Sequence, residues 1–231
     1  MAAVDAIERA LATLSTEKHF HRLEAPLQLL AEAVDPRVRE ALVAKYAEAE
    51  KRGDRGAMLR TAILRALRRH ATGEDLAVLE RAARTYERLP PNDTEVAESM
   101  RAAALIAMNE IDEALASFHA VRLLFEPAAL SGEPALTAAK VLVSQGELLP
   151  LYHYSSTTDP LAAPEISAEC LRNLTGAPLP VLRELAERLR DCQDETILLG
   201  LFDLLITSSD FNDYILSFLS ETRLDAVFQW L

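Results

Sequence analysis

The residues best suited to chemistry lie between Tyr152 and Asp159, in the stretch Tyr-His-Tyr-Ser-Ser-Thr-Thr-Asp. His153 could act as a general acid or base, because imidazole titrates near neutral pH, and Asp159 could orient its ring. Tyr152 and Tyr154 add aromatic surface. We interpret this stretch as the end of an interrupted helix followed by a long polar loop, residues 154–163. An ordinary capped loop with inward-packed tyrosines is the favoured alternative to a binding or catalytic role.

Basic side chains form a second candidate site, in the segment from Arg52 to His70. They could bind an anion or an acidic peptide. Arg65, Arg68 and Arg69 recur at spacings of three and four residues, which places them on one face of a helix. The favoured alternative pairs these side chains with Glu and Asp of neighbouring helices. From both stretches, the predicted binding residues are Arg55, Arg65, Arg68, Arg69, Tyr152, His153, Tyr154 and Asp159.

No pattern in the chain marks a nucleophile, a metal site or a cofactor. His19 and His21 are two residues apart and would face different ways on a helix, so we expect no metal there. Cys170 and Cys192 have neither zinc-ligand spacing nor the density of a disulfide framework. The motif Gly-x-Ser-x-Gly is absent from the sequence. We expect Cys170 in the core and no catalytic residue, metal or cofactor, and we favour a non-enzymatic chain over an enzyme.

The elements that carry these residues are predicted to be helical throughout. Half of the 231 residues are hydrophobic, and the chain contains only seven glycines. Ala, Leu, Glu and Arg are abundant, and all four favour helix. The first residues form an amphipathic helix with Asp5 and Glu8 inside its apolar pattern, unlike a signal peptide. No apolar run approaches the roughly 20 residues of a membrane span, so we expect a cytoplasmic protein without a membrane partner.

Charge is distributed unevenly along the chain. The net charge is −12, which argues against general nucleic-acid binding. Residues 36–90 carry 13 basic and 8 acidic side chains, a net charge of +5, whereas residues 91–231 have a net charge of −14. A basic segment between acidic flanks could orient partners electrostatically. Solvated charged faces on ordinary helices are the favoured interpretation.

A nine-residue apolar outline occurs five times and predicts the architecture. It first begins at Leu59, as Leu-Arg-Thr-Ala-Ile-Leu-Arg-Ala-Leu, with small residues near its centre. Its later copies begin at Met100, Leu136, Ile166 and Ile197, so successive starts are 41, 36, 30 and 31 residues apart. Each copy predicts a closely packed helix that is followed by a second amphipathic helix. We call these five the repeat helices.

Capping residues predict where the helices begin and end. Asp35 caps a helix that has Pro36 at its first position, and Gly53 ends it with a left-handed backbone. The start of the repeat helix at Met100 depends on the turn at Pro90-Pro91. The other expected helices span residues 4–14, 22–33, 36–52, 54–70, 76–89, 111–125, 133–145, 147–153, 164–174, 181–190, 194–208, 210–219 and 222–231.

Turn signals separate these helices. Thr72 to Asp75 approximate a capping box, and Pro90-Pro91 force a loop, after which Asn92 or Asp93 caps the helix that contains Met100. A kink or interruption is expected near Pro150. The chain ends in Ala-Val-Phe-Gln-Trp-Leu, which either folds back onto the preceding helix or offers an interface for self-association. We favour folding back.

Paired helices of this kind predict an all-α fold. No hairpin of two helices has enough apolar surface to be stable alone, so each must stack against its neighbours. We expect a right-handed α-α superhelix, an α-solenoid of about six helical hairpins, in a single domain over residues 1–231. Residues 1–34 would form N-terminal cap helices, residues 35–220 the helical pairs and residues 221–231 a C-terminal capping helix. A globular, non-repeating helical bundle is the alternative.

The repeat pattern resembles HEAT repeats, which form armadillo-like superhelices. The resemblance rests on paired helices every 30 to 41 residues and on the start Asp-Pro-Arg-Val-Arg-Glu-Ala-Leu-Val at residues 35–43. It covers roughly residues 22–220, and the C-terminal units are similar to the short repeats of phycobilisome-lyase-type proteins. The Asp and Arg typical of HEAT units occur clearly only once, as Asp35 with Arg37 and Arg39.

A HEAT-like solenoid implies a protein-interaction scaffold. A partner protein would lie on the inner surface formed by the second helices, such as 74–88, 111–125 and 181–190. One alternative is a bilin-lyase-like enzyme or subunit that uses the stretch from Tyr152 to Asp159. Another is a nucleic-acid-binding protein that uses the basic segment 52–70, similar to the HEAT-like alkylpurine DNA glycosylases. We favour the scaffold with a protein partner and expect no nucleic acid.

Overall fold

The computed structural model describes residues 2–127, 131–207 and 209–215. Within these ranges the fold is all-α, as predicted, and its β-structure consists of two short strands. The helices are α1 (Ala2–Thr16), α2 (Phe20–Glu32), α3 (Arg37–Arg52), α4 (Met58–Leu67), α5 (Leu76–Ala83), α6 (Glu98–Asn109), α7 (Glu113–Leu124), α8 (Ala135–Ser144), α9 (Leu148–Thr157), α10 (Pro164–Arg172), α11 (Leu179–Arg188) and α12 (Glu195–Leu205). Single 3-10 turns are η1 (Arg55–Ala57), η2 (Gly73–Asp75), η3 (Pro160–Ala162) and η4 (Ser209–Phe211), and the strands are β1 (Arg88–Leu89) and β2 (Thr94–Glu95).

The chain divides into two compact units, Met1–His119 and Ala120–Leu231. The division falls within α7, so this helix contributes residues to both units. The superhelical arrangement and the single domain over residues 1–231, with its caps, stay predictions.

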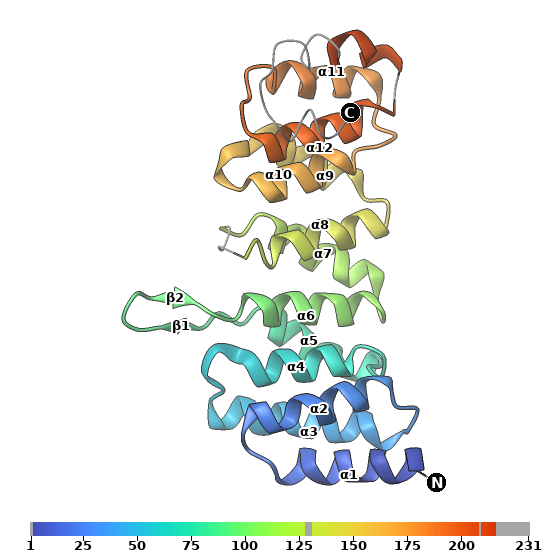
Figure 1. The fold of residues 1–231 in the computed structure, drawn as a ribbon, viewed down its shortest axis with the longest axis vertical. Coiled ribbons are helices and arrows are strands. Elements are labelled where there is room, and N and C mark those ends of the chain that lie inside the picture. The colour runs from blue at the N-terminus through green and yellow to red at the C-terminus, as the bar shows by residue number, and fades with distance from the viewer. Residues whose placement is uncertain (1, 128–130, 208, 216–231) are drawn as a thin grey trace. The chain divides into compact units, whose positions relative to one another are not determined.

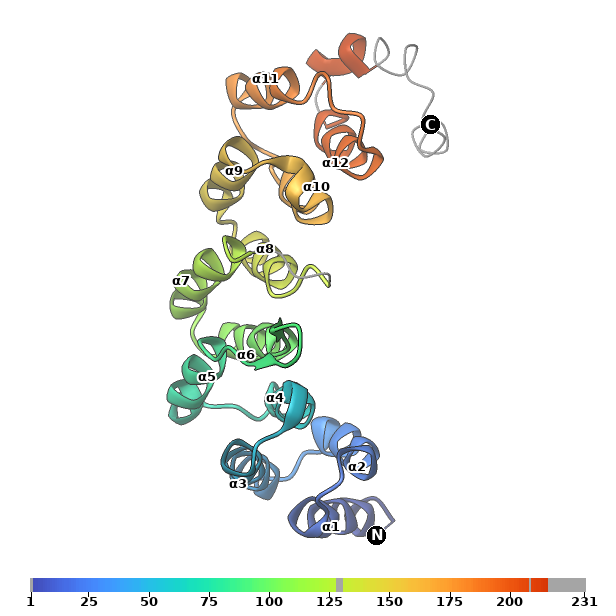
Figure 2. The ribbon, with the colours of Figure 1, turned by 90° about the vertical axis from the view of Figure 1, so that its left-hand side faces the viewer.

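In the first unit the helices form two layers. Helices α2, α4 and α6 lie in one layer, and α3 and α5 lie in the other (Figures 1 and 2). Helix α1 packs against α2 and α3, while α4 contacts α2, α3 and α6. Neighbours therefore enclose α4 along most of its surface, and the side chains of Leu59, Ile63 and Leu67 are buried.

The second unit repeats this arrangement. Helices α8, α10 and α12 lie in one layer, and α9 and α11 lie in the other (Figure 2). Helix α10 contacts α8, α9 and α12. Gly200 of α12 faces Ala168 of α10 so closely that a Cβ atom on Gly200 would lie 2.7 Å from the Ala168 Cα atom. The small residue thus sets how near the two helices can approach.

The repeat helices are confirmed as helices. The five copies of the outline fall on α4, α6, α8, α10 and α12, which are the layer-forming helices just described. The intervening helices α5, α7, α9 and α11 are the predicted second helices. None of the helices in the described ranges combines the length and apolar character needed to cross a membrane.

Several predicted boundary signals act as expected. Gly53 ends α3 with a φ of 75°, in the left-handed region. Thr72 and Asp75 form a capping box. The Asp35 carboxylate accepts the Arg37 backbone N–H at 2.9 Å, although Pro36 is the residue that directly precedes the helix. These helix boundaries could be predicted from the sequence because each depends on residues that lie within four positions of one another.

The predicted helix 54–70 was wrong at its start. The chain first makes η1, and Ala57 then has a left-handed backbone with a φ of 52°, so α4 begins only at Met58. The cause is Asp54, whose carboxylate accepts the backbone N–H of Arg60 at 2.8 Å and holds the turn closed. Met58, the first residue of α4, is exposed.

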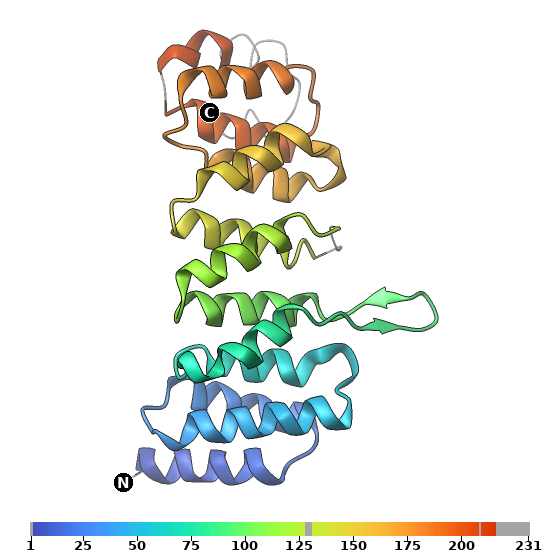
Figure 3. The ribbon, with the colours of Figure 1, turned by 180° about the vertical axis from the view of Figure 1, so that it is seen from behind.

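The predicted helix 76–89 ends early, at Ala83. The chain continues into the β1–β2 hairpin, in which Arg88 pairs with Glu95 and Leu89 with Thr94. This hairpin projects away from the helices of its unit (Figures 1 and 3). Pro90-Pro91 excludes helix at the tip. The cap expected from Asn92 or Asp93 is also wrong, because the Glu95 carboxylate accepts the Ala97 N–H at 2.8 Å before α6 begins.

The predicted loop 154–163 is shorter than expected, because α9 continues to Thr157. Pro150 lies in the first turn of α9, where a missing N–H leaves no intrahelical hydrogen bond unmade. The expected interruption at Pro150 is therefore wrong. Only residues 158–163, which include η3, connect α9 to α10. The expected helix 222–231, most of 210–219 and the question of how the apolar C-terminus packs lie outside the described residues.

Replacing Gly200 with Ala should destabilise the second unit. Alanine normally stabilises a helix by about 1 kcal/mol relative to glycine, but here the added methyl group overlaps Ala168. We expect a net loss of about 1–3 kcal/mol in the free energy of unfolding, as for other overpacked cores. Urea unfolding followed by circular dichroism measures it.

Gly73→Ala is the matched control, because a Cβ atom at Gly73 would meet nothing within 4 Å and its backbone does not require glycine. This variant should be neutral or slightly stabilising. Equal stability of Gly200→Ala and the wild type would contradict the close approach of α10 and α12.

Candidate functional site

The predicted arginine face of α4 is largely engaged in ion pairs. Arg68 pairs with Glu110, and Arg69 pairs with Glu32 of α2. All four side chains are exposed, so each pair contributes little to stability. The sequence analysis favoured pairing of these arginines with Glu and Asp of neighbouring helices, and Arg68 and Arg69 do lie opposite such carboxylates.

The other two predicted arginines, Arg55 and Arg65, are exposed and make no ion pair with another described residue. Arg65 lies in the last turn of α4. Arg55 lies in η1, beside the C-terminal end of α3, where it lines a small pocket. The four predicted arginines therefore differ in their surroundings: two form ion pairs and two do not.

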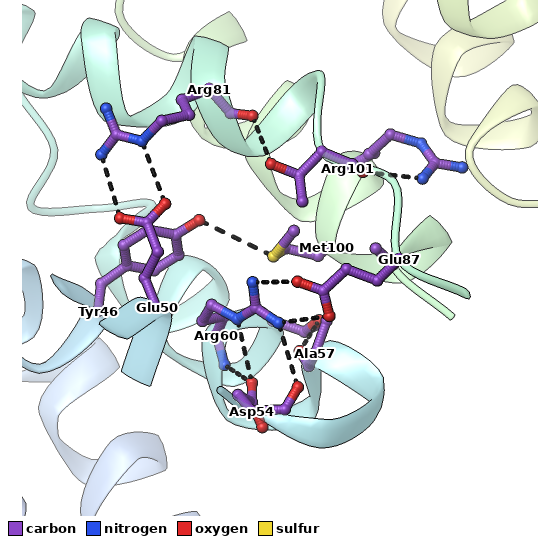
Figure 4. A network of polar contacts seen from close by, with 12 residues as sticks. Tyr46, Glu50, Asp54, Ala57, Arg60, Arg81, Glu87, Met100 and Arg101 are labelled. Atoms are coloured by element: carbon purple, nitrogen blue, oxygen red, sulfur yellow. Dashed lines mark hydrogen bonds and ion pairs between the residues drawn. The ribbon is translucent and has the colours of Figure 1, made fainter. Parts of the chain in front are cut away.

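Arg60, which the sequence placed near the exposed basic face, is instead buried in a charged network (Figure 4). Its guanidinium donates to the Glu87 carboxylate at 2.6 and 2.8 Å and to the Asp54 backbone carbonyl at 3.1 Å. The Asp54 carboxylate lies 3.4 Å from Nε. Burial disfavours the charge of Arg60, but these carboxylates outweigh it and raise its pKa.

A second buried arginine, Arg101 of α6, holds the base of the hairpin. It donates to the Glu95 carboxylate at 2.8 Å and to the Thr85 carbonyl at 3.1 Å. Its guanidinium carbon lies 4.3 Å from the centre of the exposed Tyr86 ring, at cation–π distance. Arg60 and Arg101 thus bind carboxylates on the two chain segments that lead into and out of the hairpin, and they anchor it to the helices.

Two neighbouring contacts complete the network in Figure 4. The Tyr46 hydroxyl donates to the Met100 Sδ atom at 3.8 Å, and Arg81 donates to the Glu50 carboxylate at 3.1 Å. Burial raises the pKa of Tyr46 to about 12, so its hydroxyl stays protonated. Tyr46 and Glu50 belong to α3, so the network links α3 with α5 and α6. We interpret it as structural.

The stretch from Tyr152 to Asp159 does not assemble an acid–base pair. The Asp159 carboxylate accepts the Leu161 N–H at 3.1 Å and caps η3. His153 is exposed, and its ring contacts Phe125 at a centroid distance of 5.4 Å. Tyr152 donates to Glu184 at 3.1 Å, whereas Tyr154 is buried. The favoured alternative of a capped loop with two inward-packed tyrosines thus agrees with the structure for Asp159 and Tyr154, but not for Tyr152, which is half-buried.

The two thiols are not activated for nucleophilic chemistry. Cys170 is buried as predicted, and burial raises its pKa to about 12. Cys192 is half-buried, and burial also raises its pKa. In the described part of the chain no group of three His, Cys, Asp or Glu side chains could hold a metal ion. Neither thiol therefore has the electropositive surroundings of a catalytic cysteine.

An exposed apolar surface in the second unit was missed by the sequence reasoning. Val121 of α7, Phe125 directly after the C-terminal end of α7 and Leu149 of α9 are exposed; we call these three residues the apolar face. The Phe125 ring joins the two helices through its contacts with His153 and with Tyr154, at 5.4 and 5.5 Å. The available signal was that α7 is apolar on opposite sides, which an amphipathic surface helix is not.

Phe118 lies on the same helix as Val121, three residues before it, and is 78 % exposed. Its spacing to Val121 and Phe125 follows the helical period, so the exposed apolar residues run along one side of α7. The opposite side of α7 is buried through Ala116, Ala120 and the leucines at its C-terminal end. Helix α7 therefore has two apolar sides, of which one is buried against the rest of the chain and the other is exposed.

The chain has no significant match to a protein-family model, a curated protein or a solved structure. The resemblance to HEAT repeats therefore stays a prediction, which rests on the sequence pattern.

Replacing Arg60 with Leu should be far more damaging than replacing Arg68 with Leu. Without Arg60, Asp54 and Glu87 lose their shared cation in a largely dry environment, which costs about 2–4 kcal/mol. The exposed pair of Arg68 with Glu110 contributes less than about 1 kcal/mol. Chemical unfolding of both variants measures the difference, and equal losses would show that the Arg60 network does not anchor the hairpin.

Cys170 and Cys192 should differ strongly in reactivity with a thiol reagent at pH 8. A thiol whose pKa is about 12 is almost entirely protonated there, so Cys170 should react at least about 100-fold more slowly than a free thiol. Reaction of the single-cysteine variants Cys170→Ser and Cys192→Ser, in native buffer and in denaturant, separates the two. Rapid native labelling of Cys170 would contradict its burial.

Proposed function

We propose that the chain is a non-enzymatic, HEAT-like helical scaffold that binds a partner protein through the apolar face of the second unit. The observation that supports this most is the exposure of large apolar side chains on α7 and α9, with Leu149 77 % exposed. Helix α7 lies within residues 111–125, one of the second helices expected to bind a partner.

Exposed apolar residues that occur singly are ordinary on protein surfaces, whereas a contiguous group marks an interaction site. Here Phe125 contacts the rings of both His153 and Tyr154, so aromatic surface continues from α7 onto α9. Leu149 precedes His153 by one helical turn and shares its side of α9. Aromatic side chains of this kind contribute most of the binding energy in protein interfaces.

The proposed occupant is an amphipathic helix of the partner. Apolar side chains at intervals of three and four residues along α7 form a ridge, and ridges of this spacing fit the grooves of a second helix. Burial of Leu149 alone would contribute roughly 1.5–3 kcal/mol. The ion pair of Arg122 with Glu126 lies at the C-terminal end of α7 and leaves that end without net charge from these two groups.

The two alternative functions gain no support from the contacts. Asp159 caps η3 and does not orient His153, which a bilin-lyase-like reaction at this stretch would use. Arg68 and Arg69 pair with carboxylates of the chain itself, which competes with a nucleic-acid backbone for the same guanidinium groups.

Replacing Leu149 with Ser should abolish partner binding without unfolding the chain, because this side chain is exposed. Affinity capture from a lysate of the source organism, with quantitative mass spectrometry, should recover a protein with the wild type and lose it at least about tenfold with Leu149→Ser. Leu161→Ser is the matched control, because Leu161 is also exposed but lies in η3.

A photo-crosslinking residue at position 149 should then attach to the captured protein, while the same residue at Arg183 of α11 should not. If capture is equal for all variants, or if crosslinking does not depend on position, the apolar face does not bind the partner.

A further inference from the structure

A small pocket in the first unit gathers basic side chains from three segments. Lys18 comes from the turn between α1 and α2, Lys45 and Arg52 from α3, and Arg55 from η1. Phe20 lines the pocket as well, and the pocket volume is about 130 Å³. The pocket lies in the N-terminal half of the chain, apart from the residues of the apolar face, and it contains only one of the predicted binding residues, Arg55.

The charges that line this pocket are not balanced. Glu48 accepts from both Lys45, at 2.9 Å, and Arg52, at 3.2 Å, so one carboxylate serves two cations. Asp54 also lines the pocket, but its carboxylate is engaged with Arg60.

Two cations of the lining remain. Lys18 and Arg55 are exposed and make no ion pair with another described residue. The four cations and two carboxylates of the lining leave a formal charge of +2, in a chain whose net charge is −12. This chain has more carboxylates than basic groups, so a pocket whose lining carries a net positive charge contrasts with the rest of its surface.

Lys45 is the buried cation of the pocket lining. Its side chain is only 4 % exposed, and its Nζ atom donates to the Glu17 backbone carbonyl at 2.8 Å and to Glu48. An ammonium group carries three N–H donors, and the described residues accept two of them. A buried ammonium is costly unless its surroundings compensate it, so an acceptor that enters the pocket would complete its coordination.

The surrounding backbone positions the exposed cations. Gly53 has a φ of 75°, which lets the chain turn sharply after α3 and carries Arg55 to the pocket's edge. The Glu17 carboxylate accepts the backbone N–H groups of Lys18 and His19, at 2.7 and 2.9 Å, and so fixes the other edge. These hydrogen bonds lower the pKa of Glu17 to about 2.

We propose that this pocket binds a phosphate group, with Lys45 as its buried cation and Lys18, Arg52 and Arg55 around it. A phosphate monoester carries a charge near −2, which matches the surplus of the lining, and its oxygens accept from ammonium and guanidinium donors alike. The volume admits one such group with a small substituent. The phosphate can belong to a small phosphate ester or to a phosphorylated side chain of a peptide, and the test separates these sources.

The test is isothermal titration of the full chain with inorganic phosphate at low ionic strength, with acetate as the monoanionic comparison. We expect phosphate to bind with a Kd on the order of 1 mM and acetate to bind at least about tenfold more weakly. Lys18→Gln combined with Arg55→Gln should weaken phosphate binding at least about tenfold. Both side chains are exposed and make no ion pair with a described residue, so their replacement should preserve the fold.

The matched control removes two charges elsewhere in the unit, as Lys51→Gln combined with Arg9→Gln. Both positions are exposed, on α3 and α1, and neither lines the pocket. The control should keep the wild-type affinity within about twofold. Equal weakening in both double variants, or no heat of binding with phosphate and with a phosphoserine peptide, would overturn the proposal.

Titration with that phosphoserine peptide, beside its unphosphorylated form, identifies the source of the phosphate group. Comparable affinities for inorganic phosphate and the phosphopeptide support a site for small phosphates. A phosphopeptide that binds at least about tenfold more tightly than both inorganic phosphate and its unphosphorylated form supports a site for phosphorylated side chains. Neither result depends on the partner proposed for α7 and α9.

Discussion

The enclosure of the repeat helices is the constraint on which the other contacts depend. Helix α4 is covered by α2, α3 and α6, and α10 is covered by α8, α9 and α12. A helix covered on this scale can expose few polar groups to water, and its neighbours can approach only where side chains are small. Gly200 against Ala168 shows the limit of that approach, since a single methyl group does not fit.

Enclosure also explains why so many charges of this chain serve its own fold. A cation drawn into a packed helix layer must bring carboxylates with it, because an unpaired buried charge costs several kcal/mol. Arg60 and Arg101 meet this requirement with Glu87 and Glu95, and Lys45 meets it in part with Glu48. Most basic side chains of residues 36–90 therefore form ion pairs with carboxylates of the same chain. Arg55 differs from them, because it makes no ion pair with a described residue.

The second helices are under a different constraint, since only one of their sides is needed for packing. The exposed side is charged on α5, where it carries Arg81, and on α11, where it carries Arg183 and Glu184. Helix α7 carries aromatic and aliphatic groups there instead. This contrast among the second helices favours binding of an apolar partner surface at α7. The apolar face also differs in chemistry from the cationic pocket of the first unit.

The sequence by itself determined most of the helices, the order in which closely packed and amphipathic helices alternate, and the capping box of Thr72 with Asp75. These features depend on hydrophobic periodicity and on hydrogen bonds between residues a few positions apart, both of which are visible in a linear chain. Tertiary structure alone decided that Arg60 is buried and that α5 gives way to a hairpin anchored by Arg101. It also decided that Lys18 and Arg55, 37 positions apart in the sequence, line one pocket. The reason is that an ionised or aromatic side chain takes its role from the group that faces it, and that group is usually supplied by another helix.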